Sequence, residues 1–438
     1  MATKQPVLKK ALTAIHLWAI AVGLVISGEY FGWNYGWAAG GTVGMLIATI
    51  AVTVLYVTFI FSFTELTTAI PNAGGPFTYA YKALGPLGGL IAGYATLIEF
   101  LFATPAIAYA LGSYIHFLYP SMNVMYTAIG CYVLFTAINM LGIKESALFT
   151  LLVTLLAVIE LLFFMGIVAP HFQLKNFMHN SMPFGWAGVF AALPFAMWLY
   201  LAIEGVSMVA EETKDPKRTI PKGYMAGIAT LVVLALGVMI LTGGLTDWEK
   251  LTTIDYVLPE SVSIALGKEN QLTKLFAGIG LFGLIASFHS IILTYSRQLF
   301  SLARENYLPS GLAKLNSRFQ TPHRALIVGA IIGIIAIVSG KTNELIIFSV
   351  LGAIVMYITS MISLFVLRKK EPMLERPFKA PLYPYFPIMA LILSTVCLVA
   401  IVYYNVMLSV IFFTALLLLI ILFVVSGKYK KLLSSANQ

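Results

Sequence analysis

The sequence has little charge and almost no cysteine. Only 10% of its 438 residues are charged and 60% are apolar, whereas soluble proteins carry about 25% charged residues. This shortage of charge excludes a soluble globular enzyme and a disordered chain. Two cysteines are too few for the disulfide framework of a small secreted domain. Cys131 and Cys397 both lie inside long apolar runs, so we expect buried free thiols.

Motifs for catalysis and for metal or nucleotide binding are also missing. The six histidines are scattered without metal-ligand spacing, and there is no G-x-S-x-G elbow. Residues 339–342 resemble the end of a phosphate-binding loop, but Ile335 stands where that loop requires glycine. We therefore expect no enzyme, no metal and no cofactor.

What the chain does have is long apolar runs. A membrane-spanning helix needs about 20 apolar residues, and the sequence contains a succession of such windows. The twelve windows are residues 12–38, 41–66, 85–117, 122–141, 146–169, 186–209, 223–245, 272–299, 325–340, 343–367, 383–404 and 406–426. The prediction is an all-α integral membrane protein with 12 transmembrane helices in one domain, residues 1–438. The first run is too long for a cleavable signal peptide, and loop 246–271 is expected to hold a short helix.

The basic residues indicate an orientation. If the N-terminus is inside, 22 of the 27 Lys and Arg fall on the inner side and five outside. Cytoplasmic loops of membrane proteins carry such an excess. We therefore expect a multi-pass protein of the cytoplasmic (inner) membrane with both termini cytoplasmic, and the short tails and loops suggest a bacterial protein. The net charge of +9 reflects topology, so no nucleic acid partner is expected.

Glycines and acids interrupt spans one and six at corresponding places. Residues 23–36 contain four glycines around Glu29, and Glu204-Gly205 lies inside span six. Each glycine weakens a helix by about 1 kcal/mol relative to alanine. Two broken helices predict a five-plus-five inverted repeat, with the repeats at about 12–170 and 186–367 and extra helices at 383–426. Glycines used only for close helix contacts are the alternative, but it leaves both acids unexplained.

Further acids lie within or near the spans, where charge is costly and usually functional. Glu99 lies midway along span three beside small residues, and is either a site residue or a protonated acid bonded to a neighbouring helix. Glu160, midway along span five, is either a proton carrier or a structural hydrogen-bonding group. Glu65, at the inner end of span two, is expected to be structural.

Span eight carries a polar stripe. Ser287, Ser290, Thr294 and Arg297 follow the spacing of one helix face, which suits an inner pathway or an ion site. His289 is either a proton relay or a hydrogen-bonded structural residue. The candidates for coupling transport to an ion are thus Glu160, Ser287, His289 and Ser290.

Three segments resemble motifs of one transporter family. Residues 65–79, 211–221 and 296–309 are similar, in this order, to the "AEL…P…GG.Y.Y", "EE.K.P.R..P" and "R..F..ARDG.LP" segments of the amino acid–polyamine–organocation (APC) superfamily. The resemblance covers the whole chain. It implies a secondary active transporter that binds its substrate between the two broken helices and works by alternating access.

Within that superfamily, residues 26–34 and 98–108 resemble the ethanolamine permeases. Amino acid carriers have small residues after the glycines of the first break, where free backbone N–H groups hold the substrate carboxylate. Here Trp33 and Asn34 replace them, and the anionic Glu29 would repel a carboxylate and attract an ammonium group. By this resemblance Glu204 contacts substrate, and Trp198 resembles an aromatic residue that covers the site in related antiporters.

The resemblance implies import of ethanolamine, with Glu29, Glu99 and Glu204 as polar partners and Tyr30, Trp33 and Trp198 as walls. The predicted substrate-binding residues are Ser27, Gly28, Glu29, Tyr30, Gly32, Trp33, Glu99, Trp198, Ile203, Glu204 and Gly205. The alternatives are a carrier for another amine, such as a diamine or polyamine, or for an amino acid. A non-transporting receptor is disfavoured because the chain has no signalling domain. Uniport, proton symport and exchange all stay open, the lipid bilayer is the expected surrounding, and no oligomeric state is indicated.

Overall fold

The computed structural model describes residues 10–142 and 147–436, and the ordered secondary structure in these ranges is helical apart from one isolated bridge between Leu12 and Thr213. The α-helices are α1 Ala14–Val25, α2 Ser27–Tyr30, α3 Tyr35–Ala69, α4 Pro76–Leu118, α5 Val124–Met140, α6 Ala147–Val168, α7 Leu174–Met178, α8 Gly185–Trp198, α9 Pro216–Gly243, α10 Val257–Leu266, α11 Gln271–Arg304, α12 His323–Val338, α13 Thr342–Lys370, α14 Tyr385–Tyr404, α15 Val406–Val425 and α16 Lys428–Ala436. Short 3₁₀ helices are η1 Ala169–His171, η2 Ile203–Glu212, η3 Trp248–Leu251 and η4 Ser310–Ala313.

The helices confirm the all-α membrane fold. Among the described residues, nine helical segments are long and apolar enough to cross a membrane, and four shorter apolar helices accompany them. Three of the shorter ones, α1, α5 and α12, complete the set of predicted windows. The fourth, α10, lies in loop 246–271 and is the short helix expected there. The boundaries of the two sequence repeats stay a prediction.

Two helices begin earlier than the apolar windows. Helix α3 starts at Tyr35 and α4 at Pro76, and each passes through a kink at a glycine, Gly41 (φ 64°) and Gly85 (φ 76°). A positive φ is open to glycine without the steric penalty that other residues meet. Each helix therefore continues across a bend, and the first turns lie outside the window that hydropathy selects.

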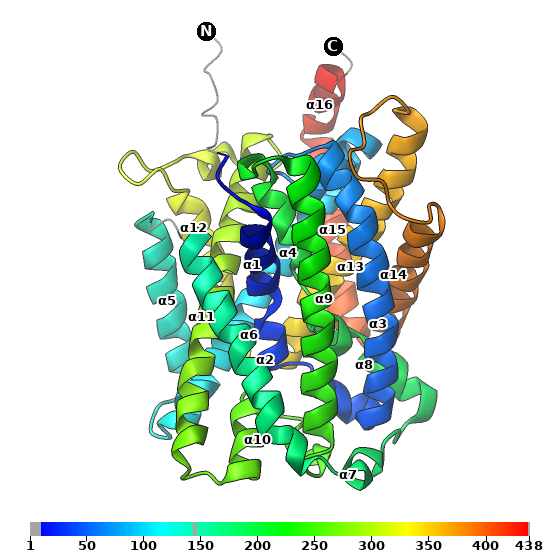
Figure 1. Ribbon diagram of the computed structural model, residues 1–438. Helices are drawn as coiled ribbons and strands as arrows, with labels where there is room; N and C mark the ends of the chain where they lie inside the picture. Colours follow the sequence, from blue (N-terminus) through cyan, green and yellow to red (C-terminus); the bar gives the residue numbers. More distant parts are fainter. Residues whose placement is uncertain (1–9, 143–146, 437–438) are drawn as a thin grey trace.

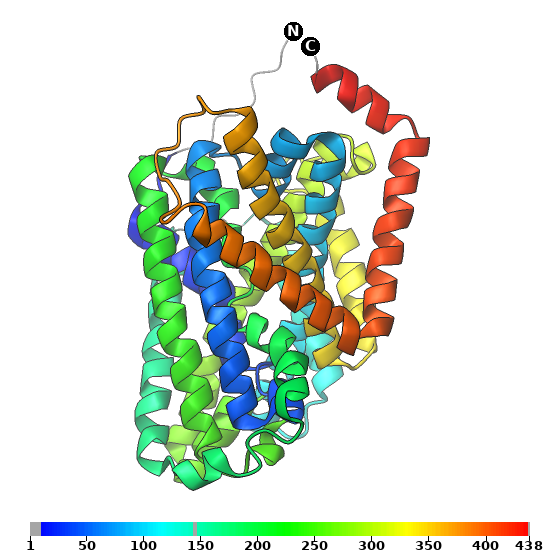
Figure 2. The same ribbon diagram turned by 90° about the vertical axis from the view of Figure 1, so that its right-hand side faces the viewer.

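The helices run alongside one another between two ends of the molecule (Figure 1). The segment that leads into α1 and helix α16 lie at one end, which we call the terminal face, while α7 and α10 lie at the other, the distal face (Figure 1). Helices α14 and α15 lie on the outer flank, and α14 crosses α3 and α13 obliquely (Figure 2). Both cysteines are free, but only Cys397 is buried and Cys131 is partly exposed, because α5 lies on the periphery.

Candidate functional site

The first predicted break is real and has two parts. Helix α1 ends at Val25, the short helix α2 follows, and residues 31–34 are non-helical before α3 begins. Gly32 has φ 92°, a conformation that disfavours other residues. Its backbone N–H donates to Asn34 Oδ1 at 3.0 Å, and Trp33 Nε1 donates to the carbonyl of Glu29 at 3.1 Å. Side chains of the break therefore satisfy backbone groups that the missing helix turns leave open.

The second break lies slightly earlier in span six than its glycine suggested. Helix α8 ends at Trp198, residues 199–202 form turns, and Ala202 has φ 78° before η2 begins at Ile203. Glu204 and Gly205 thus follow the break, in the first turn of η2, and Trp198 precedes it. A left-handed conformation is strained for a residue other than glycine, and such strain is common at functional sites.

The two breaks touch each other. Trp198 Nε1 donates to the carbonyl of Phe31 at 2.9 Å. A side chain at Gly28 would collide with the carbonyl of Trp198, and one at Gly205 would lie 2.7 Å from Leu24 Cδ1. Glycine is therefore required at position 28 for the broken helices to approach this closely, whereas at position 205 a larger residue would force the Leu24 side chain to move.

The acids predicted for the site are deeply buried. Glu29, Glu99 and Glu204 are 0% exposed. Both carboxyl oxygens of Glu29 and of Glu99, and Oε1 of Glu204, lack a full hydrogen bond. No salt bridge within the described part of the chain involves these three acids. A buried ionised carboxyl without a partner is very unfavourable, so this arrangement suits bound protons or a bound cation.

Glu99 and Glu204 form a pair. Their side chains lie within hydrogen-bonding reach of each other, and the backbone N–H of Ala202 faces Glu99, although outside the geometry of a full hydrogen bond. The hydroxyl of Tyr357 lies 3.2 Å from Glu204 Oε2 and 3.0 Å from the hydroxyl of Tyr56. We call Glu99, Glu204 and these two tyrosines the carboxyl pair cluster.

Helix α13 holds this cluster in place, and sequence reasoning missed it. Ser349 Oγ donates to the carbonyl of Glu99 at 2.6 Å, and a side chain at Gly352 would lie 2.7 Å from the Glu99 backbone nitrogen. Tyr357 reaches Glu204 two turns further on. The available signal was a tyrosine and serines in the middle of span ten, polar groups that need partners at membrane depth.

Glu29 stands apart from the pair. Tyr30 and Tyr200 are its titratable neighbours, and the Tyr200 hydroxyl lies 2.7 Å from Thr53 Oγ1. The ring of Tyr200 is 5.1 Å from that of Tyr56, which belongs to the carboxyl pair cluster. The adjacent rings of Tyr200 and Tyr56 thus separate Glu29 from the carboxyl pair, and only Glu99 and Glu204 contact each other.

Tyr30 does not face the carboxyl pair. Its hydroxyl donates to Glu160 Oε2 at 2.8 Å, and the Tyr114 hydroxyl donates to its carbonyl at 3.1 Å. Glycines of α11 accommodate both groups, since a side chain at Gly283 would lie 2.8 Å from the Tyr30 hydroxyl. The predicted wall residue and the coupling candidate Glu160 therefore form one network between α2 and α6.

The polar residues of span eight contact different parts of the structure. Ser287 Oγ lies 2.8 Å from Ser27 Oγ and donates to the carbonyl of Leu24 at 2.8 Å, so it contacts the first break. His289 instead contacts α5 through Asn139 Nδ2, 2.9 Å from its Nδ1. Ser290 is half-buried and its carbonyl accepts from Thr294.

The distal end of the first break is closed by hydrogen bonds to loop 246–271. Asn34 Nδ2 donates to the carbonyls of Leu251 and Ile254 at 2.6 and 2.9 Å. Asp255 accepts from the Tyr35 hydroxyl at 2.6 Å and from Thr342 Oγ1 at 3.0 Å. Burial raises the pKa of the Asp255 carboxyl to about 6, despite these hydrogen bonds.

Glu65 has the structural role that the sequence indicated. Arg368 binds both of its carboxyl oxygens at 2.8 and 2.6 Å, Arg376 lies 3.3 Å away, and the Ala380 N–H donates to it at 2.7 Å. Arg368 also lies over the ring of Tyr383, 3.6 Å from its centroid. This ion cluster ties the segment after α13 to the terminal end of α3.

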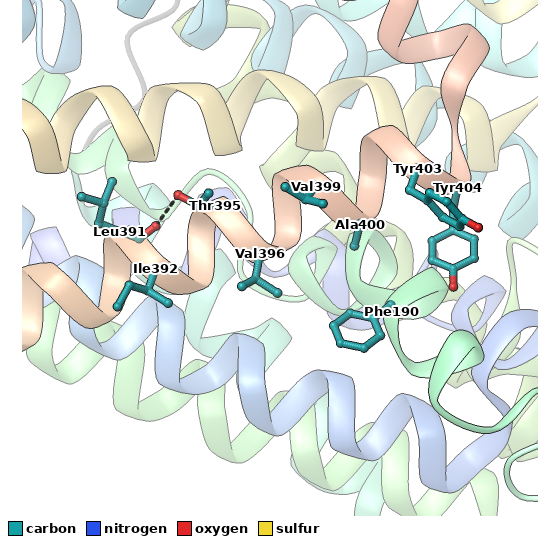
Figure 3. Close-up of a pocket in the computed structure, with 9 residues that line it drawn as sticks. All are labelled: Phe190, Leu391, Ile392, Thr395, Val396, Val399, Ala400, Tyr403 and Tyr404. Atoms are coloured by element: carbon teal, nitrogen blue, oxygen red, sulfur yellow. Dashed lines mark hydrogen bonds between the residues drawn. The ribbon is translucent and has the colours of Figure 1, made fainter.

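An apolar groove of about 660 Å³ lies away from the breaks, between α8 and α14 (Figure 3). Phe190 faces one side of it, and a row of α14 residues from Leu391 to Tyr404 forms the other. Its lining contains no acid, and Val399 and Tyr403 are 63% and 73% exposed. The groove therefore lies on the exposed flank and offers no carboxylate partner to an ammonium group.

A family model and three relatives that are all permeases or transporters each match most of this chain. A family model described as amino acid permease matches residues 12–430. An uncharacterized transporter of Rhizobium meliloti is 28% identical over 89% of this chain and 85% of the relative. The branched-chain amino acid permease of Bacillus subtilis is 25% identical over 88% and 86%, and the methylthioribose transporter of the same organism 25% over 89% and 87%.

Proposed function

The chain belongs to the amino acid permease family of the APC superfamily, and within this family of transporters we propose that it carries ethanolamine. The observation behind this proposal is the set of buried acids Glu29, Glu99 and Glu204 beside the two breaks, without a cationic side chain in a salt bridge to them in the described ranges. A small primary amine is protonated at neutral pH, since amines of the lysine type have a pKa of about 10.

The first break also supports a ligand without a carboxylate. In an open helix break the backbone N–H groups are the natural anion site. Here the N–H of Gly32 is already bound to Asn34, and Trp33 is 0% exposed and packed edge-on against Trp37, 4.9 Å between centroids. Little space and few donors are left for a carboxylate, and the nearby Glu29 adds like charge.

The proposed orientation puts the terminal face in the cytoplasm and the distal face outside. The excess of Lys and Arg on the terminal side supports it. In this orientation the hydrogen bonds of Asn34 and Asp255 close the external side of the site. The predicted coupling residues Glu160, Ser287, His289 and Ser290 stay a prediction, as does import as the direction of transport.

Uptake by the purified protein in proteoliposomes tests the substrate. Labelled ethanolamine should enter protein-containing vesicles and not empty ones, and excess unlabelled ethanolamine should compete. Putrescine, lysine and alanine distinguish the alternatives: competition by putrescine or lysine at equal concentration would favour a broader amine carrier. Competition by alanine would favour an amino acid carrier, in line with the name of the Bacillus subtilis branched-chain amino acid permease.

A further inference from the structure

The buried carboxyl groups of Glu99 and Glu204 lie close enough to repel each other if both are ionised. We propose that the Glu99–Glu204 pair holds one shared proton while the site is empty, and that a protonated amine takes the place of this proton. Each bound amine would then release one proton. The second half rests on the proposed function, whereas the shared proton concerns the empty protein alone.

The surroundings of the pair leave no other way to balance its charge. Both residues are 0% exposed. The titratable groups that face them in the described chain are tyrosines: Tyr56 on α3, Tyr224 on α9 and Tyr357 on α13. A tyrosine is neutral at pH 7 and donates one proton at most. Two ionised carboxyls in contact repel each other and cannot donate to each other, so one of them binds a proton.

Neighbouring helices hold the backbone segments of the two residues close together. Ser349 and Gly352 fix the backbone of Glu99 against α13. Tyr357 binds the Glu204 carboxyl, and Tyr224 donates to the Glu204 carbonyl at 3.3 Å. The pair thus spans α4 and the second break, and a ligand that enters between the broken helices meets both carboxyls.

The exchange balances in atoms and charge. The empty pair carries one proton and one negative charge. When an ammonium group R–NH₃⁺ binds, the shared proton leaves to water, both carboxyls are ionised and the ammonium cation offsets one of the two charges. The site therefore keeps a net charge of −1. A doubly ionised pair with neither partner is strongly disfavoured at membrane depth, so the site changes sides only with a proton or an amine in place. Transport would be an electroneutral exchange of amine for proton.

Infrared spectroscopy tests the shared proton without any ligand. The ligand-free protein at pH 7 should show the C=O stretch of a protonated carboxyl. The intensity of one carboxyl should be lost from this band in both Glu99→Gln and Glu204→Gln, because the amide takes the place of the protonated carboxyl and donates to the one that remains ionised. Any contribution of the other buried acids, Glu29 and Glu160, is the same in every variant. Glu344→Gln is the matched control and should keep the band, because Glu344 is a half-exposed acid paired with Lys341. A band that persists at full size in both pair variants overturns the proposal.

Proton release on binding tests the exchange. Calorimetry in two buffers of different ionisation enthalpy should report about one proton released per ethanolamine bound to the unmodified protein and to Glu344→Gln. It should report close to none for Glu99→Gln and Glu204→Gln. Binding without proton release by the unmodified protein overturns the exchange. Loss of release in Glu160→Gln with full release in Glu99→Gln would assign the proton to Glu160 and also overturn it.

The failures of the two proposals are distinguishable. If ethanolamine does not bind but putrescine or methylammonium does and releases a proton, the ethanolamine assignment is wrong and the exchange stands. If ethanolamine binds and neither pair variant loses infrared intensity, the substrate stands and the shared proton is wrong.

Discussion

Asp255 makes stability depend on pH in a direction that can be calculated. Its pKa is raised from an ordinary value of 3.8 to about 6 in the folded protein. An acid with a raised pKa binds its proton more tightly when folded. Its contribution to stability is therefore fully present below pH 3.8 and is lost as the pH rises through about 6. Asp255→Asn removes this pH-dependent loss of stability, because an amide does not ionise, and its oxygen can still accept the hydrogen bond from Tyr35.

The magnitude follows from the shift. One pKa unit corresponds to 1.36 kcal/mol of stability. At pH 7 the ionised Asp255 carboxyl therefore destabilises the folded protein by at most about 3 kcal/mol. About 1.3 kcal/mol of this loss arises between pH 5 and pH 7. Asp255 is half-buried and water screens part of this, so about 1–3 kcal/mol in total is expected. Asp255→Asn should be more stable than the unmodified protein at pH 7, and its advantage should shrink towards pH 5.

Thermal unfolding of the two purified proteins from pH 5 to pH 8 measures this effect, on the order of 1–2 °C per kcal/mol. The matched control is Glu269→Gln, also on the distal side. Lys274 holds the pKa of Glu269 below its usual range, so the contribution of Glu269 to stability is lost as the pH falls. Because Glu269 is exposed, its effect on the melting temperature should be small. A difference between Asp255→Asn and the unmodified protein that does not change with pH would refute the reasoning.

Three further predictions concern transport and stability. Glu29→Gln should weaken ethanolamine uptake, with up to about 3–5 kcal/mol lost when one partner of a buried ion pair is removed. The proper control is Glu344→Gln, at a half-exposed acid paired with Lys341, and equal uptake by the two variants would remove Glu29 from the site. Glu65→Ala should destabilise the protein by about 3–5 kcal/mol because it removes the buried carboxylate that offsets the charges of Arg368 and Arg376. A melting temperature within 1 °C of the unmodified value would contradict this role. Serine and alanine should not compete with ethanolamine, because like charge in a closed site costs roughly a hundredfold or more in affinity, while Trp33→Ser with Glu29→Gly should shift preference towards a zwitterion. Strong competition by serine against the unmodified protein would favour an amino acid carrier.

Much of the fold was predictable because hydropathy acts over whole segments. Every apolar window corresponds to a helical segment, and both predicted breaks exist. The predicted windows miss the first turns of α3 and α4, which extend through glycine kinks. The second break centres on residues 199–202 and not on Gly205. Hydropathy records the apolar stretch of a helix, but it carries no signal for a positive φ at an alanine such as Ala202.

The sequence by itself determined which acids are buried, because a carboxyl inside an apolar run has no other place to go. It also indicated where the two helices break, through clustered glycines beside those acids. Only the tertiary structure decided which polar groups meet. It joined Glu99 to Glu204 across α4 and η2, left Glu29 beside Tyr200, and turned Tyr30 towards Glu160. The physical reason is that a side chain's partner at membrane depth comes from another helix, and the contacts that bring α13 against Glu99 depend on packing between residues some 250 positions apart in the chain.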